Sequence, residues 1–196
     1  MILLVALIVA LLAALIRGGR ISALGEVRFR AGWLAIVALA IQAVVIYLPH
    51  HTGTGPWSLG ALFLAGSYVA LVAVVVLNRH TPGMLLIGAG LAMNYLAMAS
   101  NGGYMPIAPD ALEQAGLGHL ALAGEVGSRI LATKDILLPR EQTLLWVLSD
   151  ILVIPDTLPI SSVFSVGDVV VALGVCWFFQ RAMAPATPQP EQATVP

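Results

Sequence analysis

The sequence predicts an all-α membrane protein: a bundle of about five transmembrane helices with a long external segment that contains short or half-inserted helices. The first reason is composition, because 59% of the 196 residues are hydrophobic and 10% are charged, whereas a soluble domain is nearer half apolar and a quarter charged. The mean hydropathy of +0.95 points the same way. The second reason is that the apolar residues gather into five long runs, and the third is that most arginines fall on alternate connections between these runs. We therefore do not expect a water-soluble globule.

The apolar runs are long enough to cross a membrane. A helix needs roughly 20 mostly apolar residues to span a hydrocarbon core of about 30 Å, and fewer where the bilayer thins. The expected spans are residues 1–16, 31–48, 58–77, 83–99 and 163–179. We expect the first run to be retained as an anchor and not cleaved as a signal peptide, because its positive charges follow the apolar stretch.

The distribution of basic residues predicts the orientation. Six of the nine lie between spans one and two, between spans three and four, or after span five: Arg17, Arg20, Arg28, Arg30, Arg79 and Arg181. Positively charged connections stay in the cytoplasm. The sequence therefore predicts an external N-terminus, a cytoplasmic C-terminus and an external segment over residues 100–162.

The external segment is too long to be a simple connection, so we expect structure within it. Asp110 and Glu113 have the spacing of a capping box, which predicts a short helix starting at Pro109. Polar and apolar residues recur at helical spacing over residues 142–153, which predicts an amphipathic helix that lies at the interface or half inserts. Whether residues 142–155 cross the membrane stays open at this stage. Residues 1–182 form one integral membrane domain, and residues 183–196 are expected to be a disordered tail.

Five residues are candidates for a binding site. Asp168 is the one ionisable residue inside an expected span, and it either caps the helix or belongs to a polar site. Asn101, Gly102 and Gly103 follow the fourth run, where exposed backbone N–H groups could cradle an anion or a headgroup, or simply end the helix. Asp150 is an external carboxylate, with a solvated or a functional role.

The remaining polar residues have structural interpretations. Gln42 and Asn94 are expected to hydrogen-bond between helices. His50 and His51 are expected at the surface, and no metal site is predicted because no His-x-x-x-His or cysteine pairing accompanies them. Cys176 is expected to pack between helices. With a net charge of -1, the chain has no basic face for nucleic acid, and no cofactor can be named.

Three motifs resemble the pattern of a family of small bacterial integral membrane proteins known only as a domain of unknown function. They are NGGYMP at residues 101–106, LSDILVIP at residues 148–155 and FSVGD at residues 164–168. The resemblance covers about residues 1–182 and implies a multi-pass protein of the bacterial cytoplasmic (inner) membrane. It implies no activity or cofactor, and it adds weight to Asn101, Asp150, Gly167 and Asp168.

The external side of the expected bundle gathers most of the candidate polar residues, which predicts an outward-facing polar pocket. The leading hypothesis is a membrane protein that binds a lipid headgroup, a small solute or a partner there. One alternative is a membrane enzyme that acts on a lipid-linked substrate with external Asp residues. Another is a transporter or channel subunit. Beyond the lipid bilayer, a membrane-protein partner or a second copy of the chain is a candidate partner, and whether the protein is an enzyme stays open.

Overall fold

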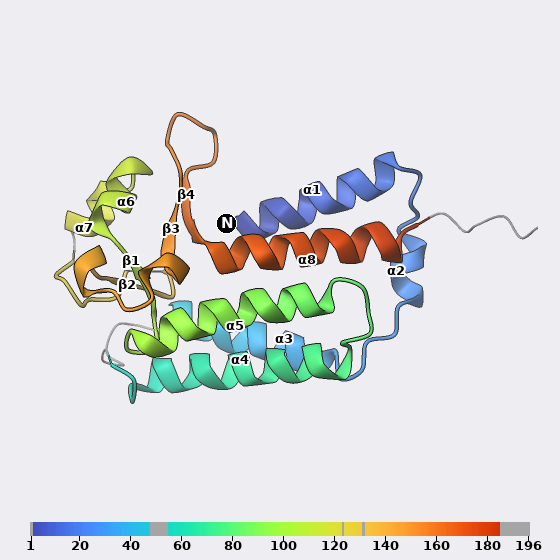
Figure 1. Ribbon diagram of the computed structural model, residues 1–196, viewed down its shortest axis with the longest axis horizontal. Coiled ribbons are helices and arrows are strands. Elements are labelled where there is room, and N and C mark those ends of the chain that lie inside the picture. The colour runs from blue at the N-terminus through green and yellow to red at the C-terminus, as the bar shows by residue number, and fades with distance from the viewer. Residues whose placement is uncertain (1, 48–54, 123, 131, 185–196) are drawn as a thin grey trace, which may run out of the picture.

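The computed structural model describes residues 2–47, 55–122, 124–130 and 132–184. Long helices lie side by side in a bundle, and a small sheet with short helices covers one end of it (Figure 1). We call this covering segment, residues 101–165, the cap. The fold is mostly helical, as expected, but the predicted all-α class is wrong because a small sheet is present.

The long helices lie in the predicted runs. They are α1 (Ile2–Ile16), α3 (Trp33–Tyr47), α4 (Leu59–Leu77), α5 (Met84–Ser100) and α8 (Val166–Ala182), with a short α2 (Ser22–Glu26) between the first two. Within the described residues, α4 alone is long and apolar enough to cross a membrane by length and composition. The helices α1, α3 and α5 are apolar but shorter, with 15, 15 and 17 residues. The described part of the chain thus has one candidate span by this criterion.

The cap is built on a four-stranded sheet. Its strands are β1 (Met105–Ile107), β2 (Asp135–Leu137), β3 (Asp150–Ile154) and β4 (Ser162–Ser165), in the order β2-β1-β3-β4. The strand β1 runs parallel to β2 and β3, whereas β3 and β4 are antiparallel. Short helices α6 (Pro109–Gln114) and α7 (Gly118–Leu122) and the 3-10 turns η2 (Arg140–Gln142) and η3 (Trp146–Leu148) complete it.

The predicted amphipathic helix over residues 142–153 is wrong. The chain there forms one short 3-10 turn and then strand β3. Leu145 has a left-handed backbone with φ of 52°, which interrupts any α-helix. Ile151 and Val153 are β-branched and favour a strand, and Pro155 biases the preceding residue toward extended backbone. Pairing with β1 and β4 then outweighs the helical spacing of the apolar residues.

The short helix predicted at Pro109 is confirmed as α6, but its predicted capping box is wrong. The N-cap residue is Ala108, which makes no side-chain cap hydrogen bond, and Asp110 lies two positions past it, within the first turn. Pro109 at the first helical position supplies the start signal instead, because its fixed φ suits a helix and it has no N–H to satisfy.

One hydrophobic core joins the bundle to the cap. Tyr104 and Met105 at the start of the cap are fully buried against residues of α4 and α5. The cluster consists of Val45, Ala61, Leu64, Tyr68, Ala97, Met98, Tyr104, Met105 and Ile136. A second cluster, which contains Ile107, Leu112, Ile130 and Leu137, lies within the cap. The cap is therefore held against the bundle by apolar packing as well as by the chain connections.

Helices α5 and α8 pack closely because glycines face each other along them. A Cβ on Gly90 would collide with the carbonyl oxygen of Gly167 and lie 2.7 Å from the backbone N of Val171. A Cβ on Gly174 would lie 2.8 Å from the carbonyl oxygen of Gly83. Small residues of this kind let two helix backbones approach closely.

We expect Gly90→Ala to destabilise the protein by about 1–3 kcal/mol, because the new methyl group forces α5 and α8 apart. Gly66→Ala is the matched control, since Gly66 also lies within a helix but has nothing within 4 Å of its missing Cβ. There the helix propensity of alanine should leave stability unchanged or raise it by up to about 1 kcal/mol. Thermal unfolding in detergent compares the two, and equal unfolding temperatures would contradict the packing argument.

Candidate functional site

A buried hydrogen-bond network links α5, β4 and α8. Asn94 Nδ2 of α5 donates to Asp168 Oδ1 at 2.7 Å, and Ser165 Oγ donates to Asn94 Oδ1 at 2.7 Å. Ser165 and Asp168 also form a reciprocal capping box at the start of α8, where Asp168 N donates to Ser165 Oγ at 3.0 Å and Ser165 N donates to Asp168 Oδ2 at 3.3 Å. Asp168 therefore caps its helix and binds a neighbouring helix at once.

Asp150 and Lys134, both in the cap, lie near this network. Asp150 begins β3 and pairs in register with Ser165 of β4, so it lies beside the start of α8. Its Oδ1 atom is buried and has no hydrogen-bond partner among the described residues. Lys134 immediately precedes β2, and Asp135 is the first residue of that strand. We call Lys134, Asp135, Asp150 and Asp168 the charge cluster.

Burial and mutual charge interactions shift the pKa values of three members of the charge cluster. Burial, reinforced by the neighbouring Asp135 carboxylate, raises the pKa of Asp150 well above its ordinary value. Burial also raises the pKa of Asp135, although Lys134 opposes the shift. Burial lowers the pKa of Lys134, but the nearby Tyr68 phenol and the cluster's carboxylates outweigh it and raise that pKa above its ordinary value. The cluster therefore favours a charged lysine beside a carboxyl that holds its proton.

Asn101, Gly102 and Gly103 lie where α5 ends. Asn101 Nδ2 donates to Ala97 O and Leu144 O, and Asn101 Oδ1 accepts from Leu144 N at 2.9 Å. Gly102 and Gly103 both have positive φ, of 79° and 89°. A Cβ on Gly103 would collide with Ala61 of α4. These three residues shape the turn and fasten the segment before η3 to α5.

A polar pocket of about 230 Å³ opens within the cap, between α6, the η2–η3 segment and β3. Adjacent strand residues point to opposite faces, so Ser149, Ile151 and Val153 line this pocket while Asp150 belongs to the charge cluster behind them. Asp110 and Gln114 of α6 supply polar groups from one side. Arg140 supplies a positive charge, and its guanidinium lies 3.4 Å from the centre of the Trp146 ring.

The structure thus brings two of the predicted site residues, Asp150 and Asp168, into one charge cluster. Asn101, Gly102 and Gly103 lie apart from it at the end of α5, and none of the five lines the pocket in the cap. All five stay candidates. His50 and His51 lie outside the described residues, as does the tail from residue 185.

The comparison with known protein families decides the classification of the chain. Residues 26–180 match the sequence model described as Family of unknown function (DUF5317). The chain belongs to this family. The predicted membership of a family of unknown function is thereby confirmed, and the description of DUF5317 assigns no activity. No curated protein and no solved structure matches the chain.

Three charged residues near the candidate site of this DUF5317 chain were not predicted from the sequence: Arg129, Lys134 and Asp135. Lys134 and Asp135 stand in an unremarkable polar stretch, and their neighbours Asp150 and Asp168 lie far along the chain. Arg129 is buried too: its Nη2 donates to Val45 O at 2.9 Å and its guanidinium lies 4.8 Å from the centre of the Tyr104 ring. The sequence signal that could have identified Arg129 is a basic residue among apolar neighbours. Across the part of the chain that the structure describes, no cluster of His, Cys, Asp or Glu suits a metal ion.

We expect stability to depend on pH through Asp150. Because its pKa is raised in the folded protein, its contribution is fully present below the unfolded pKa of about 3.9 and is lost as pH rises through the folded pKa. In wild type, the free energy of unfolding should therefore decline as the pH rises above about 4. Asp150→Asn should make this decline less steep, by up to ~1.4 kcal/mol per pH unit. Asp135, shifted in the same direction, should leave a residual slope.

Thermal unfolding between pH 4.5 and 8 checks this expectation. Glu141→Gln is the control, because Glu141 is exposed and its replacement changes the net charge by the same amount. The same pH dependence in wild type and Asp150→Asn would show that Asp150 is ionised alike in the folded and unfolded chains.

Proposed function

We propose that this protein is a multi-pass membrane protein whose cap, on the outer side, binds a small zwitterionic group: a solute or a lipid headgroup that carries both charges. The helices α1, α3, α4, α5 and α8 would cross the bilayer, and the arginine-rich connections would face the cytoplasm. The observation that carries the binding proposal is the pocket of about 230 Å³ in which Asp110 and Arg140 supply opposite charges.

The outward surface of the bundle supports the membrane part of the proposal. Large apolar side chains are exposed along all five long helices, and examples are Leu4, Ile36, Val69, Leu85 and Leu173. Only 39% of the apolar window in α4 is buried, which is far less than a helix in a soluble core requires. Soluble proteins rarely expose continuous apolar surface on this scale, so lipid chains are the solvent that fits it.

Exposed aromatic residues lie near both ends of the bundle. Tyr47 at the end of α3 and Trp57 just before α4 lie toward the cap and are 78% and 85% exposed. Trp33 at the start of α3 and Trp177 near the end of α8 lie toward the opposite end and are 64% and 49% exposed. Tryptophan and tyrosine concentrate at the two interfaces of a membrane. Their positions support a bundle whose two ends would lie at the two interfaces of a membrane.

The arginine-rich connections gather at the end of the bundle away from the cap (Figure 1). Arg17 Nη1 donates to Gln180 Oε1 at 3.0 Å, so the end of α1 meets the end of α8. Arg30 N donates to Asn78 Oδ1 at 2.8 Å, which brings the α2–α3 connection to the end of α4. One positive end supports the orientation with the cap outside.

The size and chemistry of the cap pocket favour a small ligand with two charges. Its volume lies below the roughly 300–1,000 Å³ of typical small-molecule sites, so a headgroup or a solute of amino-acid size fits best. A carboxylate from Asp110 would pair with an ammonium group, and the guanidinium of Arg140 with a phosphate or carboxylate. The Trp146 ring keeps Arg140 in place by a cation–π contact. A protein partner would need a larger surface.

A second candidate function is an enzyme that acts on a lipid-linked substrate, with Asp150 as the proton donor. The raised pKa of Asp150 favours it, because a carboxyl whose pKa is raised keeps its proton to higher pH and is better suited to act as a general acid. Asp150 lies one strand position from pocket residues Ser149 and Ile151 but is itself buried. We therefore place binding first.

The orientation predicts how two introduced cysteines react in intact cells. In a Cys176→Ala background, Leu158→Cys in the β3–β4 connection should react with a membrane-impermeant maleimide, because residue 158 is exposed. Gly25→Cys in α2 should react only after lysis. The missing Cβ of Gly25 has nothing within 4 Å, so the substitution is tolerated. Labelling of both sites in intact cells would contradict the crossing of the membrane, and the reversed pattern would contradict the orientation.

The cap pocket predicts binding of phosphoethanolamine to the purified protein in neutral detergent. Arg140→Gln should weaken the affinity about tenfold or more, because a charge-assisted hydrogen bond is lost, and Asp110→Asn should do the same. The matched controls are Glu141→Gln and Glu113→Gln, which change a neighbouring charge outside the pocket lining. Isothermal titration calorimetry measures the affinities. Unchanged affinity in both pocket variants, or no binding by wild type, would overturn the assigned ligand class.

A further inference from the structure

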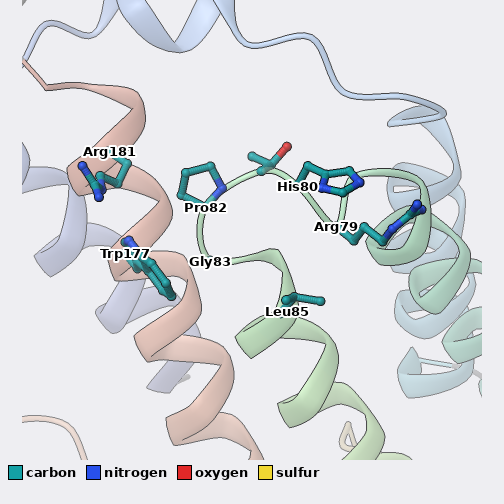
Figure 2. Close-up of a pocket in the computed structure, with 8 residues that line it drawn as sticks. Arg79, His80, Pro82, Gly83, Leu85, Trp177 and Arg181 are labelled. Atoms are coloured by element: carbon teal, nitrogen blue, oxygen red, sulfur yellow. The ribbon is translucent and has the colours of Figure 1, made fainter.

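A cavity of about 490 Å³ opens at the end of the bundle away from the cap (Figure 2). One wall is the C-terminal part of α8, with Trp177 and Arg181. The other is the α4–α5 connection and the start of α5, with Arg79, His80 and Leu85. The volume lies within the usual range for small-molecule sites, roughly 300–1,000 Å³. It is separate from the cap pocket and shares no residue with it.

The charges on this cavity have one sign. Arg79 and Arg181 each contribute a permanent positive charge, and His80 contributes an imidazole. No acidic side chain is among the described residues that line it. Arg79 Nη1 donates to Val76 O at 3.2 Å, which holds the guanidinium beside the last turn of α4 with its other N–H groups available. With arginines on its two opposite walls (Figure 2) and no carboxylate among its described lining residues, the cavity carries net positive charge and favours an anion.

The two walls are held at a fixed separation. Gly83 has a positive φ of 83°, and a Cβ there would collide with the carbonyl oxygen of Gly174 and lie 3.0 Å from Phe178 N. The α4–α5 connection therefore rests directly on the backbone of α8. On the other side, Asn78 Nδ2 donates to Arg30 O at 2.9 Å and to Val74 O at 2.7 Å. Arg79 and Arg181 thus lie on two walls whose backbones are fixed by these contacts.

The apolar part of the lining continues the cavity toward the middle of the bundle. Leu85 lies in the first turn of α5 and Trp177 lies one helical turn before Arg181 on α8 (Figure 2). A ligand in this cavity would meet positive charge at the end of the bundle and apolar surface further in. The start of α5 adds the partial positive charge of a helix N-terminus at Gly83.

We propose that this cavity binds a phosphate group, presented by an anionic lipid headgroup or as free phosphate. Guanidinium groups match phosphate oxygens in charge and geometry, and the volume also admits the group esterified to the phosphate. The lipid source rests on the proposed membrane function, which places this end at the level of the cytoplasmic headgroups. The phosphate chemistry rests only on the residues that line the cavity.

The test compares two double variants with equal loss of charge. Arg79→Gln with Arg181→Gln removes both guanidinium groups of the cavity. Arg20→Gln with Arg28→Gln removes two exposed arginines from the same end of the bundle that do not line it. Inorganic phosphate is titrated into each protein in neutral detergent by calorimetry. Retention of dioleoylphosphatidylglycerol against dioleoylphosphatidylcholine is measured by native mass spectrometry. Unfolding temperatures establish that each variant is folded, and the single variants replace the double one if it is not.

We expect the cavity variant to lose about tenfold or more in affinity for one of the two probes, whereas the control variant should change it less than about twofold. Preferential retention of the anionic lipid identifies a headgroup, and calorimetric binding of inorganic phosphate identifies free phosphate. Absence of binding to both probes, or equal weakening by the two double variants, would overturn the proposal. The phosphate titration needs neither the orientation nor the cap pocket, so its outcome and the outcome of the cysteine labelling are independent.

Discussion

The hydrogen bond from Asn94 to Asp168 is the contact on which the arrangement of bundle and cap depends. It joins α5 to the first turn of α8 at a depth where water is excluded, and Ser165 completes it by accepting from Asp168 N and donating to Asn94. Ser165 is also the last residue of β4 and pairs in register with Asp150 of β3. A single polar junction therefore sets both the contact of two helices and the position of the sheet above them. Loss of one partner would leave a buried polar group unsatisfied, which costs about 1–3 kcal/mol.

The same junction explains why charge is concentrated where the cap meets the bundle. Once Ser165 and Asp168 are fixed, the antiparallel pairing of β3 and β4 places Asp150 in the interior. The charges of Lys134, just before β2, and Asp135, at its start, act on Asp150 there. Burial of so many ionisable groups is costly unless protons and charges are shared among them. Burial, reinforced by the neighbouring Asp135 carboxylate, raises the pKa of Asp150, and the positive charge of Lys134 opposes that shift. On the opposite face of the same strand, Ser149 and Ile151 line an open pocket, so one strand separates the buried Asp150 carboxyl from that pocket.

The predictable part of this fold is the part encoded locally. Each long helix is marked by an apolar run that ends at Pro, Gly or Arg residues, and each lies within a few residues of its predicted range. Strands of three to five residues have no such signal, because their pairing joins residue 105 to residue 135 and residue 107 to residue 150. For the same reason Asp168 could be recognised as a capping residue from its position, whereas its partner Asn94 and the nearby Lys134 could not be assigned to it. The helix wrongly predicted over residues 142–153 shows nonlocal pairing overriding a local periodicity.

The glycine-rich contact of α5 with α8 connects the two ends of the molecule. At one end the pair carries Asn94 and Asp168 beneath the cap, and at the other it carries Gly83, Leu85, Trp177 and Arg181 around the arginine-lined cavity. Because glycines allow backbone contact, the two helices have little freedom to slide or tilt without collision. A shift of α8 large enough to admit a bulkier ligand at one end must therefore displace the capping network at the other. Because the pair of helices is rigid, the geometry at one end of the bundle constrains the geometry at the other end. The charged residues at the two ends differ, with arginines around one cavity and both Asp110 and Arg140 around the cap pocket.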